Sequence, residues 1–170
     1  KPLAITALGV KAVAEARAKN PAPVVQIGFQ WGAHSGRREI LRRVRAGEIG
    51  DILELRFQRL NGRDEHRGWY ADRKLSGDWM LEQAVHEFNV IWSTLRQDPV
   101  KAYAAGRSGV LPGRDTTNYY TAVLQYPGNT IVRYSHGWIE VPGFDGGGMR
   151  MEVVGTRGAA DLLHGNMFLR

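Results

Sequence analysis

Three polar residues recur at helical spacing in residues 76–92, SGDWMLEQAVHEFNVIW: Glu82, His86 and Asn89 lie at i, i+4 and i+7. Side chains four residues apart on a helix can touch. A carboxylate beside an imidazole stabilises the protonated ring and fixes which ring nitrogen faces outward, which is what a proton-transferring histidine needs. An ordinary surface ion pair has the same spacing and contributes only about 0.3–0.5 kcal/mol. The spacing by itself favours that ordinary pair.

The apolar residues of the same segment indicate where these polar side chains point. They form a stripe typical of a helix face turned toward a core: Leu81, Val85, Phe88, Trp92 and Leu95. The polar stripe is offset by one residue, so it follows the edge of the buried face. Trp79 lies one turn before Glu82, and Trp69 and Tyr70 lie in the preceding loop. Aromatic rings could line a pocket for the C–H faces of sugars and polyols, although for each tryptophan alone core packing is the more ordinary use.

The composition limits the kind of protein. A chain of 170 residues, 43% of them hydrophobic, fits one compact domain. It has no cysteine, which excludes disulfides, thiolate nucleophiles and cysteine-bound zinc. No apolar run approaches the roughly 20 residues of a membrane-spanning helix, so we expect no membrane partner. The chain begins at Lys1 without a methionine, which leaves a removed presequence, an exported form or an upstream domain open. Our expectation is a cytoplasmic protein.

The net charge is +6, and basic residues concentrate in residues 36–48, GRREILRRVRAGE. There Arg38, Arg42 and Arg45 fall at i, i+4 and i+7, a stripe that could meet phosphates. The same stripe suits a solvated helix face partly paired with neighbouring glutamates. We adopt the solvated face and expect no nucleic acid partner, because no recognised nucleic-acid-binding motif accompanies the stripe.

The order of expected elements defines the fold class. Apolar periodicity and turn residues predict helices over 3–19, 36–48 and 78–95, strands over 23–30, 51–61 and 99–109, a hairpin over 118–138, a flexible link over 143–148 and two short strands around 155–158. Helices come early and strands dominate the second half. This segregation predicts an α+β fold with a largely antiparallel sheet.

Several well-known catalytic motifs are missing from the sequence. No G-x-G-x-x-G follows an expected strand and opens a helix, and GFDGGG at 143–148 has neither the spacing nor a helix behind it. No H-E-x-x-H, Walker or G-x-S-x-G pattern occurs either. We therefore expect no nucleotide cradle and no metal site within this chain.

Four segments, in order, resemble the Gfo/Idh/MocA family of NAD(P)-dependent oxidoreductases, which act mainly on sugars and cyclitols. They are KPLAITA at the N-terminus, VVQIGFQ, RRVRAGEIGDILELR and SGDWMLEQAVHEFNVIW. The resemblance implies an open, largely antiparallel sheet with two or three helices on one face. It also implies that residues 1–20 are the linking segment and helix from the end of a missing dinucleotide-binding domain. Residues 21–170 would then be the substrate-binding and dimerisation domain.

The resemblance assigns roles to individual residues. Lys1 matches a lysine near the nicotinamide and the reacting hydroxyl, and Pro2, expected after a cis bond, would share the contact with the cofactor. His86 matches the histidine that removes or returns the hydroxyl proton, and Glu82 matches the acid that orients it. The chain departs from the family pattern in three places: Glu82 and Asn89 stand where aspartate is frequent, and Trp31–Gly32 stand where an arginine often follows.

The expected substrate contacts complete the candidate site, and they come from the loop and the helix that follows it: His66, Trp69, Arg73, Trp79 and Asn89.

The favoured function is hydride transfer between NAD or NADP and a sugar, inositol or related polyol. One alternative is an NAD-dependent redox-neutral glycosidase of the same family, and another is a non-catalytic binding or assembly member. Apolar residues occupy both alternating sets of residues in the later strands, and no helix is available to cover one face of their sheet. We therefore expect a homodimer or homotetramer formed through the open sheet.

Overall fold

The computed structural model describes residues 1–62, 68–141, 143–144 and 146–170. Its helical elements are α1 (Ala7–Lys19), α2 (Gln30–Ala33), α3 (Ser35–Arg45), η1 (Gly68–Ala71), α4 (Arg73–Ser76), α5 (Trp79–Glu82), α6 (Val85–Leu95) and η2 (Pro127–Asn129). Its strands are β1 (Ile52–Leu60), β2 (Lys101–Arg107), β3 (Tyr119–Gln125), β4 (Ile131–Gly137), β5 (Gly148–Gly155), β6 (Gly158–Asp161) and β7 (Asn166–Leu169). None of the helices in the described ranges is long and apolar enough to cross a membrane.

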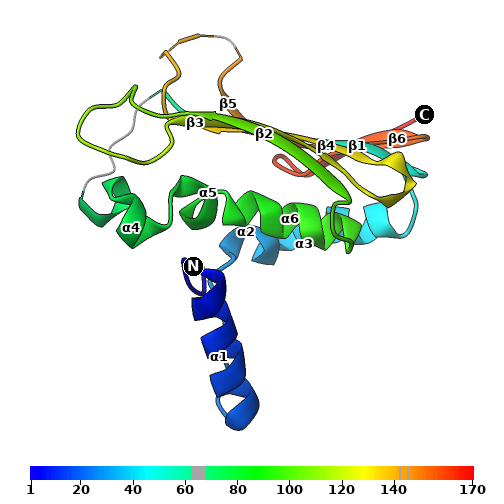
Figure 1. The fold of residues 1–170 in the computed structure, drawn as a ribbon. Coiled ribbons are helices and arrows are strands. Elements are labelled where there is room, and N and C mark those ends of the chain that lie inside the picture. Colours follow the sequence, from blue (N-terminus) through cyan, green and yellow to red (C-terminus); the bar gives the residue numbers. More distant parts are fainter. Residues whose placement is uncertain (63–67, 142, 145) are drawn as a thin grey trace.

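The strands form one seven-stranded sheet in the order β2-β3-β4-β1-β5-β6-β7. Among the strand pairs of the described residues, only β1–β4 is parallel, and the other five are antiparallel. Helices α2 to α6 lie along one face, while α1 projects away from the sheet (Figure 1). The predicted fold class is confirmed: an open, mostly antiparallel sheet with helices on one face.

The core lies between this sheet face and helices α3 and α6. Alternate strand residues point into it, because successive side chains of a strand face opposite sides. Leu55 and Phe57 of β1 are buried there against Leu41 of α3 and Ile91 of α6. Each such side chain contributes roughly 1.5–3 kcal/mol when it leaves water. Packing therefore fixes how α6, and with it His86, sits on the sheet.

The opposite sheet face carries charges. Glu54 pairs with Arg56 and Arg133 on this face, and Arg56 also lies 3.7 Å from Glu152. No helix among the described residues covers it (Figure 1). A sheet face without a covering helix is what the sequence predicted. Its charged and polar side chains, however, make it less apolar than the sequence suggested. Subunit pairing through it stays a prediction.

The predicted strand over 23–30 is wrong. Residues 24–29 have no regular structure, and the side chain of Val24 is 93% exposed. A strand needs a neighbour that accepts and donates its backbone hydrogen bonds, and no strand of the described sheet pairs with this segment. Helix α1 formed as predicted but buries none of its residues.

The predicted continuous helix over 78–95 is also wrong, because it is interrupted at Gln83–Ala84 between α5 and α6. At the break the Ala84 N–H bonds to the Trp79 carbonyl, five residues back, at 3.0 Å. The segment begins at Asp78, whose backbone has φ 77° and whose carboxylate accepts hydrogen bonds from the Trp79 and Thr117 amides.

Candidate active site

Lys1 and Glu82 come together although 81 residues separate them. The Lys1 ammonium forms an ion pair with the Glu82 carboxylate and donates to the Glu82 backbone carbonyl at 2.6 Å. The Glu82 side chain is 5% exposed and that of Lys1 17%, so the pair is largely removed from solvent. The Lys1–Pro2 peptide bond is cis. An ion pair this shielded holds the lysine at one place beside α5.

His86 lies in an aromatic setting at the start of α6. Its ring stacks on Trp31, with the centroids 5.3 Å apart and the planes at 22°, and meets the edge of Phe29 at 6.3 Å. Both rings come from residues 29–31 around the start of α2, so α2 forms one wall of the site. Among the described residues the buried Nδ1 of His86 has no hydrogen-bond partner.

The electrostatic surroundings keep the His86 ring neutral. Burial, together with the positive charges of Lys1 and Arg59, lowers the pKa of His86 to about 4, although the negative charge of Glu82 acts in the opposite direction. An unprotonated imidazole at neutral pH is a proton acceptor. Glu82 favours the protonated ring, as expected, but burial and the two positive charges outweigh its effect on the pKa.

Glu82 makes its contacts with residues other than His86. Its carboxylate pairs with Lys1, and it also meets Tyr70, whose pKa burial and the hydrogen bond to Glu82 raise to about 12. The interruption of the helix at Gln83–Ala84 removes the regular i, i+4 geometry that would have placed Glu82 beside His86. The structure brings Lys1, Glu82 and His86 into one region. Within it the Glu82 carboxylate contacts Lys1 directly.

The expected substrate contacts are spread around this centre. Trp79 is fully buried and packs edge-on to Trp138 at 5.8 Å, so its ring belongs to the core. Trp69 is half exposed. Arg73 pairs with Asp78 at 3.1 Å, at the edge of α4.

Asn89 lies against α2, where its Oδ1 would be only 2.6 Å from a Cβ added at Gly32. A glycine at position 32 is therefore what lets α2 approach α6 so closely. His66 lies outside the described residues.

Sequence reasoning missed a buried polar cluster behind His86. The Arg59 guanidinium lies over both Trp31 and Trp138, at 5.1 and 5.6 Å from the ring centroids. Its Nη1 is 3.8 Å from Oε1 of Glu87, which is 1% exposed. Burial raises the pKa of Glu87 and Arg59 partly offsets the rise, so that the pKa lies at about 7. The sequence held one signal for Arg59: it follows Leu55 and Phe57 at alternate positions of the strand, so its side chain points to the same buried face.

The cluster continues through His136 on β4. Gln83 Oε1 accepts from Trp138 Nε1 at 2.9 Å and lies 3.3 Å from His136 Nε2, so Nε2 donates to it. His136 Nδ1 lies 3.0 Å from the Tyr134 hydroxyl. The same Nδ1 is 3.7 Å from Glu87 Oε1, so His136 belongs to the surroundings of the Glu87 carboxyl.

The chain is similar in sequence and in fold to known proteins. The chain is 39% identical over 101 residues to an inositol 2-dehydrogenase of Serratia proteamaculans, covering 59% of this chain and 28% of that protein. It is 29% identical over 171 residues to an inositol 2-dehydrogenase of Burkholderia cenocepacia, covering 95% and 46%. Its fold matches scyllo-inositol dehydrogenase of Lactobacillus casei, solved with NAD(H) and scyllo-inositol, with a TM-score of 0.72, 19% identity, and coverage of 95% and 48%.

The chain spans less than half the length of these curated relatives. A family model described as the GFO/IDH/MocA C-terminal domain matches residues 38–161. That range includes α6, the break before it and most of the sheet. The chain therefore belongs to the GFO/IDH/MocA C-terminal domain family.

Proposed function

We propose that the whole protein transfers a hydride between a nicotinamide cofactor and a carbinol carbon of an inositol, a sugar or a related polyol. The observation that carries the proposal is a neutral His86 close to a shielded Lys1–Glu82 ion pair. The first supplies a proton acceptor and the second a fixed positive charge. The inositol 2-dehydrogenase relatives favour an inositol within the substrate class.

The proposed chemistry divides between the cofactor and this chain. The nicotinamide, when bound, accepts or returns the hydride. The side chains fit such a partner, because they provide a base and a cation in one region of the chain. Lys1 and Pro2 would contact the cofactor, with most of its binding supplied by a part of the protein outside this chain. Whether NAD or NADP is used depends on that part.

His86 takes the hydroxyl proton as the carbinol is oxidised, since its ring is neutral. The Lys1 ammonium stabilises the alkoxide that develops on the same oxygen. Glu82 holds the ammonium in place through its carboxylate and its backbone carbonyl. Trp31 stacks on His86 and fixes the plane of the ring, so it joins the site as a positioning residue. In the reverse direction His86 returns the proton to the oxygen.

The test uses the full-length protein with NAD⁺ and NADP⁺ in turn and with myo-inositol, scyllo-inositol, glucose and an alkyl glucoside. Net reduction of either cofactor by an inositol or by glucose supports the proposal. Cleavage of the glucoside with NAD⁺ bound and no net reduction would replace it with redox-neutral glycoside hydrolysis. Binding of a polyol with neither reaction would favour a non-catalytic binding or assembly protein.

We also propose that the protein pairs with a second copy through the uncovered sheet face. The support is the absence of any covering helix among the described residues and the mixed apolar and charged character of that face. Sedimentation of the full-length protein at micromolar concentration should show a dimer or tetramer. Val123 lies on this face, and Val123→Glu should shift the distribution toward monomer, whereas a wild-type monomer would contradict the proposal.

A further inference from the structure

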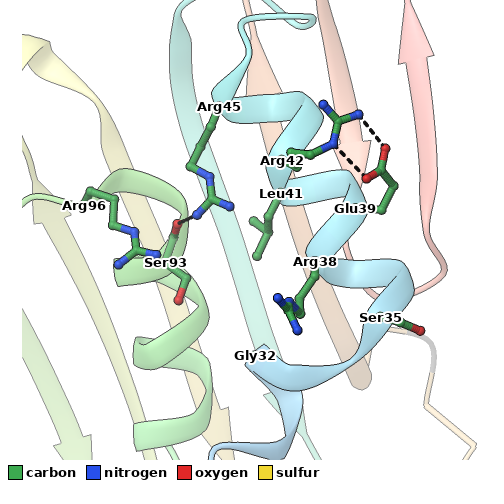
Figure 2. A pocket seen from close by; sticks show the side chains of 9 residues that line it. All are labelled: Gly32, Ser35, Arg38, Glu39, Leu41, Arg42, Arg45, Ser93 and Arg96. Carbon is green, nitrogen blue, oxygen red and sulfur yellow. Dashed lines mark hydrogen bonds and ion pairs between the residues drawn. The ribbon is translucent and has the colours of Figure 1, made fainter.

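A cavity of about 490 Å³ lies between α3 and α6, and Gly32 of α2 also lines it, whereas His86 does not. Figure 2 shows the residues around it. Its lining is Gly32, Ser35, Arg38, Glu39, Leu41, Arg42, Arg45, Ser93 and Arg96. Four guanidinium groups against one carboxylate give this lining a net charge of +3. The described residues thus place a concentrated positive charge around a space large enough for a small molecule.

The four arginines are not all committed to partners in the protein. Arg42 forms a double hydrogen bond with Glu39 at 2.7 and 2.8 Å, and Figure 2 shows this pair on the side of α3 away from α6. Arg45 reaches toward α6, where its Nη1 donates to the Ser93 carbonyl at 2.9 Å. The guanidinium of Arg38 has no ion-pair or hydrogen-bond partner among the described residues. One cation is therefore neutralised, and the others keep donors for a ligand.

Helix ends explain some of these arginines but not Arg38. A cation is stabilised near the carboxyl end of a helix, which accounts for Arg45 on α3 and Arg96 at the end of α6. Arg38 lies in the first turn of α3, where the helix dipole disfavours a cation and where no acidic residue stands. A bound anion beside Arg38 would remove this unfavourable charge.

The backbone at Arg96 is a second unusual feature of the same cavity. Arg96 ends α6 with φ 53° and ψ 30°, a left-handed conformation in which glycine or asparagine is preferred. The guanidinium lies over the Trp92 ring at 4.4 Å, which directs it along the end of α6. An arginine at such a position keeps a positive charge at the cavity that glycine would not supply.

We propose that this cavity, termed here the arginine cavity, binds a small anion bearing two or more phosphate groups. Guanidinium groups match phosphate oxygens with two parallel N–H donors each, and several of them converging favour more than one phosphate. The site is distinct from the candidate active site, since the Trp31 ring of α2 faces His86 while Gly32 of the same helix lines the cavity.

The test measures binding of inorganic pyrophosphate to the full-length protein by calorimetry, at fixed ionic strength set with chloride. NAD⁺ is present in excess, so that pyrophosphate does not report on a dinucleotide site. Arg38→Gln with Arg45→Gln should weaken binding about 10-fold or more, in line with the loss of two charge-assisted contacts. The control is Arg43→Gln on the same helix, which removes one positive charge outside the cavity and should change the Kd less than about 2-fold, since a surface pair contributes little.

A variant that binds pyrophosphate more tightly gives a second test. Its result cannot be explained by a loss of folding. Glu39→Gln removes the one carboxylate of the lining and releases Arg42, so pyrophosphate should bind about 2- to 5-fold more tightly. A sugar bisphosphate is tested beside pyrophosphate. If the sugar bisphosphate binds more tightly than pyrophosphate, the site is assigned to phosphorylated metabolites; if the two bind equally, it is assigned to free polyphosphate. No pyrophosphate binding by the wild type, or equal losses in the Arg43→Gln protein and the double variant, would overturn the proposal.

Discussion

Replacing Glu87 with glutamine should flatten the pH dependence of stability. The Glu87 carboxyl is buried behind His86, and its two oxygens have no hydrogen-bond partner among the described residues. Burial raises its pKa from 4.5 to about 7. The folded state therefore binds a proton more tightly than the unfolded state, and its stabilisation is fully present below pH 4.5 and lost as the pH rises through 7. At about 1.4 kcal/mol per pKa unit, the wild type should lose roughly 3 kcal/mol relative to Glu87→Gln across this range.

Urea unfolding of both proteins at a series of pH values measures this loss as a difference in free energy of unfolding. The comparison cancels groups that titrate alike in both proteins. Glu15→Gln on α1 is the control, because that carboxylate is exposed and its variant should follow the wild type. A constant difference between wild type and Glu87→Gln would refute the reasoning, because it would mean that Arg59, 3.8 Å away, keeps Glu87 ionised throughout.

Three further substitutions probe the site and its support. Lys1→Met removes a positive charge that lowers the pKa of His86, so an NMR titration of the His86 ring should show a higher pKa. An unchanged pKa would mean that Lys1 does not act on His86. Trp31→Ala removes the ring stacked on His86 and should lower kcat/KM by about 10- to 100-fold, with Trp31→Phe retaining most activity; equal activity in all three proteins would deny Trp31 a positioning role. Asp78→Ala should cost about 1–2 kcal/mol in urea unfolding through the lost cap. Asp78→Gly should cost less, because glycine relieves about 1–3 kcal/mol of strain at φ 77°, and the reverse order would argue against strain there.

Elements with local signals were predictable from the sequence. The β3–β4 hairpin formed as expected because Pro127–Asn129 supply the turn between two strand-like runs. The break between α5 and α6 carried no such signal, since Gln83 and Ala84 are compatible with a continuous helix. Residues 24–29 have strand-forming side chains, but strand structure depends on a pairing partner that periodicity does not reveal.

The candidate site was only partly predictable for a related reason. Lys1, Glu82 and His86 were identified from the family resemblance, and the structure places them in one region. The partner of Glu82 could not be read from helical spacing, because it comes from the far end of the chain. Arg59 and Glu87 meet only when β1 packs under α6, so their pairing depends on tertiary structure. Side chains whose chemistry depends on such long-range contacts are the ones that sequence patterns miss.

The most direct test of the account is the rate of hydride transfer in a single turnover of the full-length protein, with the cofactor and inositol bound before mixing. We predict that His86→Ala lowers this rate by about 10²–10⁴-fold, the usual contribution of a general base. The matched control is His164→Ala, which removes an exposed histidine paired with Asp161 and should leave the rate unchanged. A His86→Ala rate near that of the wild type, with the cofactor and inositol still bound, would contradict the assignment of His86 as the proton acceptor.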